Sequence, residues 1–214
     1  MFYALKRLFR TIQYLKFSQI YMRIIYKFYK PRISIFKAPN LSRQHLNLEQ
    51  LPQKLNTLND DFEFRFLNHS ENLSEIGWNS SRVTDLWCYN LHYFVDLNAT
   101  LSNDRYFLHS KLILKWICEN PPGHGIGWDP YPVSIRVVNW IKWDLKMHKL
   151  DPIAIDNLAI QIRYLSRRLE WHLLGNHLLS NAKALILAGL YFDGLEADGW
   201  LQKGIKIFKK EIEE

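Results

Sequence analysis

Long segments with a helical spacing of apolar residues fill the chain from Leu86 onward, and all but one of the breaks between them are short. Loops this short force consecutive helices to run antiparallel, so the pattern predicts a stack of helical hairpins. Asp151 followed by Pro152 is a favourable helix start, and Asp193 followed by Gly194 indicates a turn. We expect helices at 83–101, 104–118, 132–149, 152–173, 177–192 and 196–213.

The composition agrees with an all-α fold, and the length suggests one large domain or one and a half small ones. Of the 214 residues 48% are hydrophobic and 14% aromatic, which is ample material for a core. We predict three regions: a basic amphipathic helical arm (1–32), a connector with little regular structure (33–80) and a helical body (81–214). Within the connector, the alternation of Phe and charged residues over 62–66 predicts a short β-hairpin or an edge strand.

The net charge of +7 belongs to the arm and not to the body. The first 32 residues contain eight Lys or Arg and no acidic residue, which leaves 20 basic against 21 acidic residues in the rest. The charge therefore does not indicate that the body binds nucleic acid.

The arm has the apolar spacing of an amphipathic helix. Its apolar positions are Leu5, Leu8, Phe9 and Ile12, then Phe17, Ile20, Ile24, Ile25 and Phe28. Lys16 and Arg23 interrupt the apolar run, which argues against a signal peptide and against a transmembrane helix. Two alternatives remain, a helix on an anionic membrane surface and a helix that packs against its own protein.

No metal or cofactor site is predicted from the spacing of potential ligands. Cys88 and Cys118 match no metal motif, and we expect both to be buried thiols. His172 and His177 are five residues apart, where a helical zinc pair needs four. Phosphate-binding glycine loops and nucleophile elbows are also lacking in the sequence.

Three clusters, at 87–94, 127–143 and 170–181, combine aromatic rings with amide, imidazole and guanidinium groups. Aromatic faces pack on the C–H faces of sugar rings, while Asn, His and Arg hydrogen-bond hydroxyls and carboxylates, so this combination suits an acidic sugar. The long break at 119–131 adds Pro and Gly, which is typical of ligand-binding loops. The candidate binding residues are Asn90, His92, Tyr93, Trp128, Tyr131, Arg136 and His172. Trp140, Trp143 and Trp171 have the helical spacing of core residues.

Arg136 and the pair Asn176-His177 have the most specific environments. Arg136 lies near a helix start, where the helix dipole does not favour it, so we expect a partner that is either a carboxylate ligand or a structural acid such as Asp129. Asn176 and His177 follow a helix break, and with His172 they place polar groups in an apolar stretch. Burying such groups unpaired is costly, which favours a functional role.

The chain resembles heparinase II/III-like polysaccharide lyases from about Phe64 to its end. The resemblance rests on Leu-Trp-x-Tyr-Asn-Leu-His-Tyr-Phe (86–94), Gly-Trp-Asp-Pro-Tyr-Pro-x-Ser-x-Arg-x-x-Asn-Trp (127–140) and Leu-Glu-x-His-Leu-Leu-Gly-Asn-His-Leu-Leu (169–179). It implies part of an α/α toroid followed by a β-sandwich, and β-elimination at a uronic acid. In the family an Asn, in some members with a neighbouring His, neutralises the uronate carboxylate; Asn176 and His177 match that pair and are the candidate catalytic residues.

The chain ends at Glu214, before the stretch in which the family carries a catalytic Tyr and before the β-sandwich. We therefore expect the substrate-binding part of a lyase for heparin-, alginate- or capsule-like glycans, weakly active or inactive alone. Two alternatives stay open: a non-catalytic module of surface-polysaccharide production and a peripheral membrane protein. The sequence favours a cytoplasmic or membrane-peripheral location, whereas the family chemistry also suits the periplasm.

Overall fold

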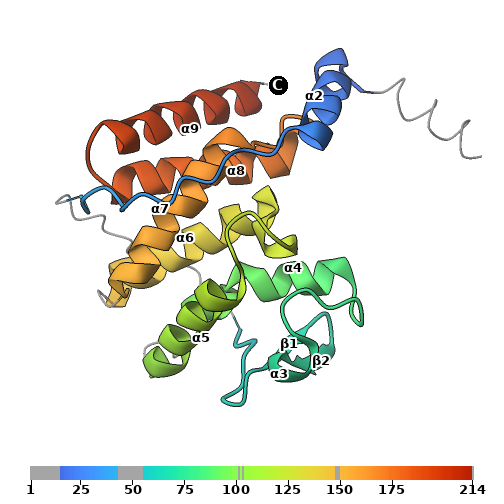
Figure 1. Ribbon diagram of the computed structural model, residues 1–214, viewed down its shortest axis with the longest axis vertical. Coiled ribbons are helices and arrows are strands. Elements are labelled where there is room, and N and C mark those ends of the chain that lie inside the picture. The colour runs from blue at the N-terminus through green and yellow to red at the C-terminus, as the bar shows by residue number, and fades with distance from the viewer. Residues whose placement is uncertain (1–14, 43–54, 101, 103, 148–149, 214) are drawn as a thin grey trace, which may run out of the picture.

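The computed structural model of the chain describes residues 15–42, 55–100, 102, 104–147 and 150–213. The described part is mainly helical, which confirms the predicted all-α class (Figure 1). Its α-helices are α2 (Phe17–Phe28), α3 (Leu73–Ile76), α4 (Asp85–Tyr93), α5 (Tyr106–Glu119), α6 (Pro130–Met147), α7 (Pro152–Arg167), α8 (Gly175–Tyr191) and α9 (Leu195–Glu213). Two 3₁₀ helices, η1 (Val95–Asn98) and η2 (Ile126–Trp128), and one β-hairpin complete the described elements.

Figure 1 shows α4 and α5 toward one end of the molecule, α6 and α7 in the middle, and α8 and α9 at the other end. Helix α6 packs against both α4 and α8, and α5 packs against α7. The tight turn at Asp193-Gly194 returns α9 antiparallel along α8. Two glycines allow these helices to approach closely: a Cβ on Gly189 would lie 2.6 Å from Leu201 Cβ, and one on Gly204 would lie 2.7 Å from Ile186 Cγ1. The predicted antiparallel hairpin is therefore present, and its packing depends on small residues.

Two predicted helices end earlier than the sequence pattern indicates. The segment predicted as 83–101 is divided at Phe94, whose left-handed φ of 57° separates α4 from η1. Helix α7 begins as predicted, with the Asp151 carboxylate accepting from the backbone N–H of Ile153 at 2.8 Å, but it ends at Arg167. Residues 168–174 therefore lie outside α7, in a loop that contains one turn, where the Glu170 carbonyl accepts from the backbone N–H groups of Leu173 and Leu174.

The core is rich in tryptophan. Trp87, Trp116, Trp128, Trp140 and Trp143 are each at most 1% exposed, which confirms the core role expected of Trp140 and Trp143. Trp171 is partly buried against the same core. Cys88 is buried as expected, but the expectation for Cys118 is wrong, because this thiol lies on the exposed side of α5.

The connector contains the expected β-hairpin, in which β1 (Glu63–Phe66) pairs antiparallel with β2 (His69–Asn72). Phe64 and Phe66 point inward, and the Phe66 ring meets the Trp87 ring edge-on at 5.2 Å between centroids. The hydrophobic face of the strand therefore packs on α4.

The buried carboxylate of Asp96, in η1, connects the segment before β1 to helix α5. It accepts from the backbone N–H groups of Thr57 at 2.6 Å and Leu58 at 3.0 Å. It also accepts from His109 at 2.9 Å and pairs with Arg105 at 2.8 Å. Burial alone would raise the pKa of Asp96, but these hydrogen bonds and the nearby positive charge outweigh it and hold the pKa below 3.8.

The arm is described only from residue 15, so the predicted apolar positions Leu5, Leu8, Phe9 and Ile12 lie outside the described residues. Helix α2 contacts the body on one side, where the Tyr26 ring lies 4.1 Å from the His172 ring and the Arg168 guanidinium lies 4.0 Å over Tyr26. Its other side is exposed, with Phe17 84% and Phe28 77% accessible. Within the described residues, α2 thus packs against the body along one side and exposes apolar residues on the other.

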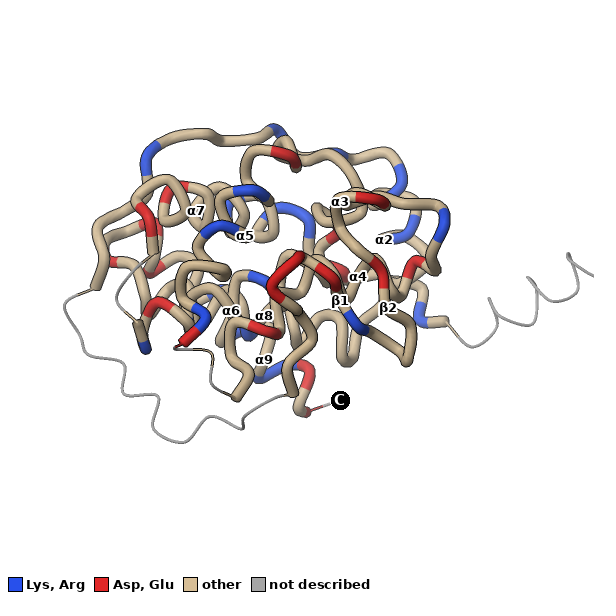
Figure 2. Tube along the Cα trace, turned by 90° about the horizontal axis from the view of Figure 1, so that it is seen from below, with Lys and Arg blue, Asp and Glu red and all other residues tan. Residues whose placement is uncertain are grey.

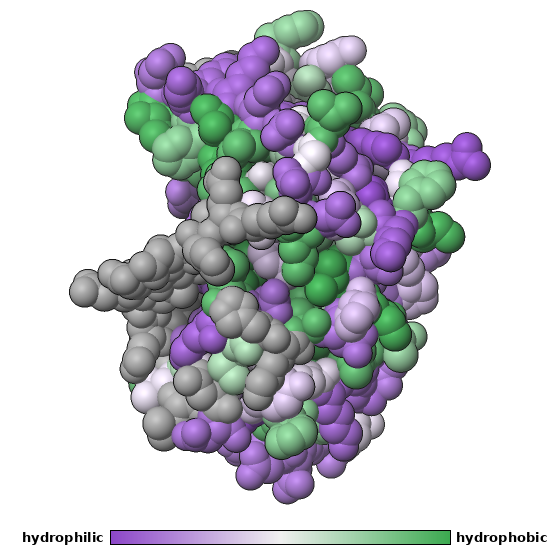
Figure 3. Space-filling view, turned by 90° about the vertical axis from the view of Figure 1, so that its left-hand side faces the viewer, coloured by the Kyte–Doolittle hydropathy of each residue, from purple (hydrophilic) through white to green (hydrophobic). Residues whose placement is uncertain are grey.

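Charged residues of both signs are spread over the described part of the body. Figure 2 shows basic and acidic residues interspersed over the helices, in keeping with the near-zero charge beyond residue 32. On the face shown in Figure 3, hydrophobic residues gather in patches between hydrophilic ones.

Candidate functional site

The start of α8 carries the candidate catalytic pair. Leu174 and Gly175 have left-handed φ values of 60° and 51°, and this turn sets the direction in which α8 begins. The backbone N–H of Gly175 donates to the Glu211 carboxylate of α9 at 2.8 Å, which fixes the turn from the neighbouring helix. Asn176 is exposed and His177 is half-buried on the first turn of α8.

His177 has a buried carboxylate partner. Its Nδ1 lies 3.1 Å from Oε1 of Glu170, in the loop that precedes α8. The side chain of His177 is 40% exposed, while that of Glu170 is 6% exposed. Burial raises the pKa of Glu170, although hydrogen bonds from Asn181 and His177 act in the opposite direction.

The side chain of Asn181 holds both the backbone and the carboxylate of Glu170. The Glu170 backbone N–H donates to Asn181 Oδ1 at 2.8 Å, and Asn181 Nδ2 donates to Glu170 Oε2 at 3.0 Å. The same Nδ2 lies 3.0 Å from Ser134 Oγ, which donates to the Pro130 carbonyl at 2.8 Å. A polar network therefore connects α6, the loop and α8 in the interior.

Tyrosine rings surround the exposed side of this network. The Tyr131 ring lies 4.6 Å from the His177 ring, and the Tyr93 ring lies 5.9 Å from that of Tyr131. Tyr89 donates from its hydroxyl to Asp129 at 2.8 Å. Burial raises the pKa of both Tyr89 and Tyr93, so their phenols remain protonated hydrogen-bond donors at neutral pH.

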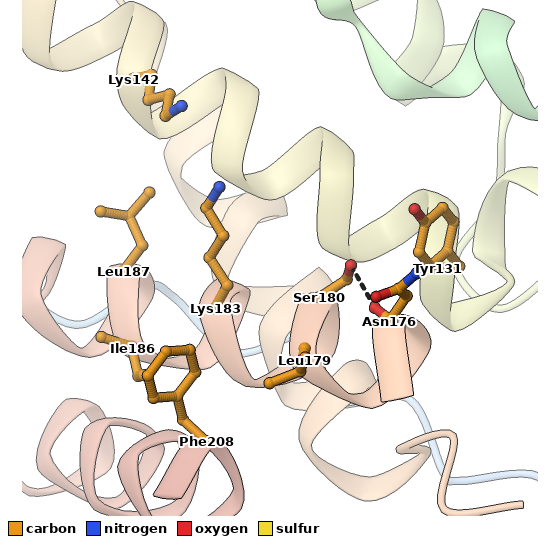
Figure 4. A pocket seen from close by; sticks show the side chains of 9 residues that line it. All are labelled: Tyr131, Lys142, Asn176, Leu179, Ser180, Lys183, Ile186, Leu187 and Phe208. Carbon is orange, nitrogen blue, oxygen red and sulfur yellow. Dashed lines mark hydrogen bonds between the residues drawn. The ribbon is translucent and has the colours of Figure 1, made fainter. Parts of the chain in front are cut away.

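A groove of about 610 Å³ extends from this cluster along α8. Tyr131 and Asn176 lie at one end, and Lys142 and Lys183 lie toward the other (Figure 4). The remaining lining residues are Leu179, Ser180, Ile186, Leu187 and Phe208. None of these described lining residues carries a carboxylate, and the two lysines give the groove its charged groups.

His92, predicted as a binding residue, is completely buried. Its Nε2 lies 3.0 Å from the Trp78 carbonyl, and Trp116 donates from its indole N–H to Nδ1 at 2.9 Å. Burial and the nearby Arg136 lower the pKa of His92 to about 3, so the ring is neutral. A Cβ on Gly127 would overlap the His92 ring, so the glycine allows the 119–131 loop to cover it.

Arg136 is also completely buried, and its partners are not acidic. Nε donates to Gln161 Oε1 at 2.9 Å, Nη1 donates to the His92 carbonyl at 3.2 Å, and the guanidinium lies 3.8 Å from the Trp116 ring centroid. Among the described residues no carboxylate pairs with it, so neither the expected structural acid nor an accessible ligand is its partner here. His92 and Arg136 were predicted to contact a ligand, but their burial places them in the interior, where their hydrogen bonds support the fold.

The other predicted binding residues differ in their access to solvent. Trp128 is 1% exposed and donates to the Asn120 carbonyl at 3.3 Å, so it belongs to the support as well. Asn90 donates to the Leu86 carbonyl within α4 at 2.8 Å. The His172 ring lies tilted against the Tyr26 ring, and burial lowers the pKa of His172 to about 4. The structure thus brings together four predicted residues, Tyr93, Tyr131, Asn176 and His177, with His172 on the preceding loop.

Sequence reasoning missed Glu170, Lys142, Lys183, Tyr26 and Arg168. The position of Glu170 and Asn181 in the same polar cluster as His177 was a signal that could have indicated a pairing. Tyr26 had no such signal, because it reaches His172 across almost 150 residues of sequence. Within the described residues no group of three or more His, Cys, Asp or Glu side chains is placed to hold a metal ion.

The described part of the chain is thus a helical protein in which an Asn-His pair at a helix start lies beside a groove that includes two lysines. The chain belongs to the heparinase II/III family, since the family model described as heparinase II/III N-terminus matches residues 10–214. This match confirms the resemblance and supports polysaccharide binding in general terms. Comparison with curated proteins and with solved structures gives no match.

Proposed function

We propose that the chain is the substrate-binding part of a polysaccharide lyase that acts on a uronic-acid-containing glycan by β-elimination. The observation that carries the proposal is the groove, which places the exposed Asn176 at one end of a surface with two lysines and no lining carboxylate. We further propose that the stacked hairpins form part of an α/α toroid and that the glycan is of heparin, alginate or capsule type.

The chemistry assigns a role to each exposed group. The Asn176 amide donates a hydrogen bond to the uronate carboxylate, which reduces its charge and makes the adjacent C5 proton more acidic. Donors directed at developing negative charge are commonly worth about 3 kcal/mol in transition-state stabilisation. His177 and the phenol of Tyr131 lie beside Asn176, where they can exchange protons or hydrogen bonds with the sugar.

A binding titration tests this proposal. Oligomers of galacturonate, alginate and heparin are added to the whole chain, with a neutral maltose oligomer as a reference, and binding is followed by calorimetry. We expect binding of an acidic oligomer that Asn176→Ala weakens at least about tenfold, or 1.4 kcal/mol. Asn40→Ala, at another exposed asparagine, is the matched control and should leave the affinity unchanged.

The outcomes separate the lyase proposal from its alternatives. If no acidic oligomer binds, the proposal fails. If an acidic oligomer binds equally well to the Asn176→Ala variant, the lyase role fails and a non-catalytic module of surface-polysaccharide production is favoured.

The exposed side of α2 favours a second function, contact with an anionic membrane surface. Phe17, Tyr21, Ile24 and Phe28 follow one helical stripe and are 84%, 54%, 56% and 77% exposed. Basic residues at 16, 23 and 27 flank this stripe, an arrangement suited to helices that lie in the interface. Among the described helices none has the length and apolar character needed to cross a bilayer.

Vesicle sedimentation tests the membrane contact. We expect the chain to sediment with vesicles that contain phosphatidylserine and not with purely phosphatidylcholine vesicles. Replacing Phe17 and Phe28 together by Ser should abolish sedimentation, whereas Phe107→Ser, at another exposed phenylalanine, should not. Equal sedimentation of both variants with anionic vesicles would rule out this role for α2.

A further inference from the structure

Glu170 has no role in the function proposed above, yet its surroundings are unusually specific. It is 5% exposed, and its two carboxylate oxygens have different partners, His177 Nδ1 on one side and Asn181 Nδ2 on the other. A buried carboxylate is costly unless each oxygen is hydrogen-bonded, and here both are.

The orientation of the Asn181 amide follows from its own contacts. Its Oδ1 accepts from the backbone N–H of Glu170, so its Nδ2 must be the atom that faces Glu170 Oε2. Ser134 donates its hydroxyl hydrogen to the Pro130 carbonyl and therefore accepts from the same Nδ2. One side of the Glu170 carboxylate is thus held by a group that can only donate.

We infer that Glu170 is a positioning residue that accepts the Nδ1–H of His177 and so leaves Nε2 as the unprotonated nitrogen of the neutral ring. Most exposed histidines prefer the opposite tautomer, with the proton on Nε2. The inference rests on the proposed function where it assigns a sugar to His177, but the tautomer is a property of the chain without ligand.

The tautomer decides what His177 can do for a glycan. An unprotonated Nε2 accepts a hydrogen bond from a sugar hydroxyl or takes a proton, whereas an Nε2–H can only donate. Because the Tyr131 ring lies 4.6 Å from the His177 ring, both groups reach the same sugar unit. Glu170 thereby sets His177 as the acceptor in this cluster.

Glu170→Gln reverses the tautomer by a simple argument. The donor Nδ2 of Asn181 remains in place, so the glutamine must turn its oxygen toward Asn181 and its NH₂ group toward His177. An NH₂ group facing Nδ1 requires that Nδ1 be an acceptor, which moves the ring proton to Nε2. The substitution keeps the size of the side chain while inverting one hydrogen bond.

Nitrogen NMR of the whole chain labelled with ¹⁵N-histidine measures both states directly. The spectrum is taken at about pH 8, above the ordinary histidine pKa of about 6.5. In the wild type we expect a protonated Nδ1 and an unprotonated Nε2 for His177, and in Glu170→Gln the reverse. The signals are assigned by their loss in His177→Gln, and His172, which has no contact with Glu170 among the described hydrogen bonds, serves as an internal reference.

Each outcome bears on one proposal. A wild-type His177 with its proton on Nε2 overturns the inference, and so does a folded Glu170→Gln variant with an unchanged tautomer. If Glu170→Gln does not fold, the wild-type spectrum still decides. If the wild-type tautomer is as expected but no acidic oligomer perturbs the His177 signals, the positioning role stands and the proposed glycan site fails.

Discussion

Two polar clusters of similar composition lie in very different surroundings. The buried cluster consists of His92, Arg136 and Gln161. The exposed cluster consists of the exposed Asn176, the half-buried His177 and Glu170, the buried partner of His177. His92 and Arg136 are inaccessible to solvent, whereas the His177 side chain is 40% exposed. His92 and Arg136, like Asn176 and His177, come from motifs that suggested a glycan site, so residue type alone does not separate a ligand contact from an internal support.

The elements around each cluster account for the difference. The left-handed turn at Phe94 ends α4 and places aromatic rings around His92, and the loop at 119–131 covers it. The exposed cluster lies at a helix start, where the first turn of α8 projects its side chains from the end of a loop. A helix start at the surface can offer donors to a ligand, while side chains in a helix interior serve packing.

The largest expected effect comes from removing the centre of the buried cluster. Arg136→Ala leaves Gln161 and the His92 carbonyl without their donor and creates a cavity beside Trp116. We expect a loss of about 3–5 kcal/mol in the free energy of unfolding, measured by urea denaturation. Arg167→Ala, at an exposed arginine that bonds the Arg32 carbonyl, should cost under about 1 kcal/mol. A loss as small for Arg136 would contradict the support role.

The buried carboxylate of Asp96 tests whether a charge in the interior makes the free energy of unfolding depend on pH. Asp96→Asn removes a carboxylate that accepts hydrogen bonds from four residues, Thr57, Leu58, His109 and Arg105. We expect the free energy of unfolding to fall by about 2 kcal/mol. Because the folded pKa of Asp96 lies below 3.8, its stabilising contribution is present above that value. It is lost as the pH falls through the lower folded pKa.

The wild type should therefore lose stability on acidification below about pH 4 more steeply than Asp96→Asn does. Thermal unfolding followed by circular dichroism between pH 2 and 7 measures the difference, in steps of about one pH unit. Parallel curves for the two proteins would show that Asp96 is not ionised in the folded state.

The helices and the polar clusters were predictable from the sequence to different degrees. The positions of α5, α6, α8 and α9 follow from local periodicity and turn residues, which act within a few residues of each other. The early end of α7 at Arg167 was not predictable, because apolar residues continue through Leu174 while the chain turns to bring Glu170 to Asn181. Tertiary hydrogen bonds overrode the helical pattern there.

The sequence predicted which residue types form the site, but not which of these residues are accessible to solvent. Asn176 and His177 were identified by a helix break after an apolar stretch, a local signal that the structure retains. The burial of Arg136 depends on Trp116 and Gln161, from two other helices, so no local pattern carries it. Likewise, the arrival of Tyr26 at His172 depends on how the arm packs.

Asn176 and Asn139 offer a matched test of the two surroundings. Asn139 is 5% exposed and donates to the Tyr93 carbonyl at 2.8 Å, so Asn139→Ala should cost about 1–3 kcal/mol of stability. Asn176→Ala should change the free energy of unfolding by less than about 0.5 kcal/mol. Urea denaturation of both variants decides, and equal losses would mean that the exposed cluster also serves the fold.

The smallest effect is expected at the far end of the groove. Lys183 is exposed and lies seven residues after Asn176 on α8, about 10 Å along the helix. An extended acidic oligosaccharide can contact both residues, whereas a single uronate held at Asn176 cannot. Lys183→Ala should therefore weaken the affinity for a trimer or longer oligomer about threefold at low salt, as expected for an exposed charge pair, and leave the affinity for a monosaccharide unaffected.

Lys206→Ala on α9 is the control and should leave both affinities unchanged. The loss of affinity in Lys183→Ala should shrink in about 0.5 M salt, because exposed charges are screened. A Lys183→Ala variant that weakens monomer and trimer equally would mean that the glycan does not run along α8, and the exposed cluster would then hold one sugar and not a chain.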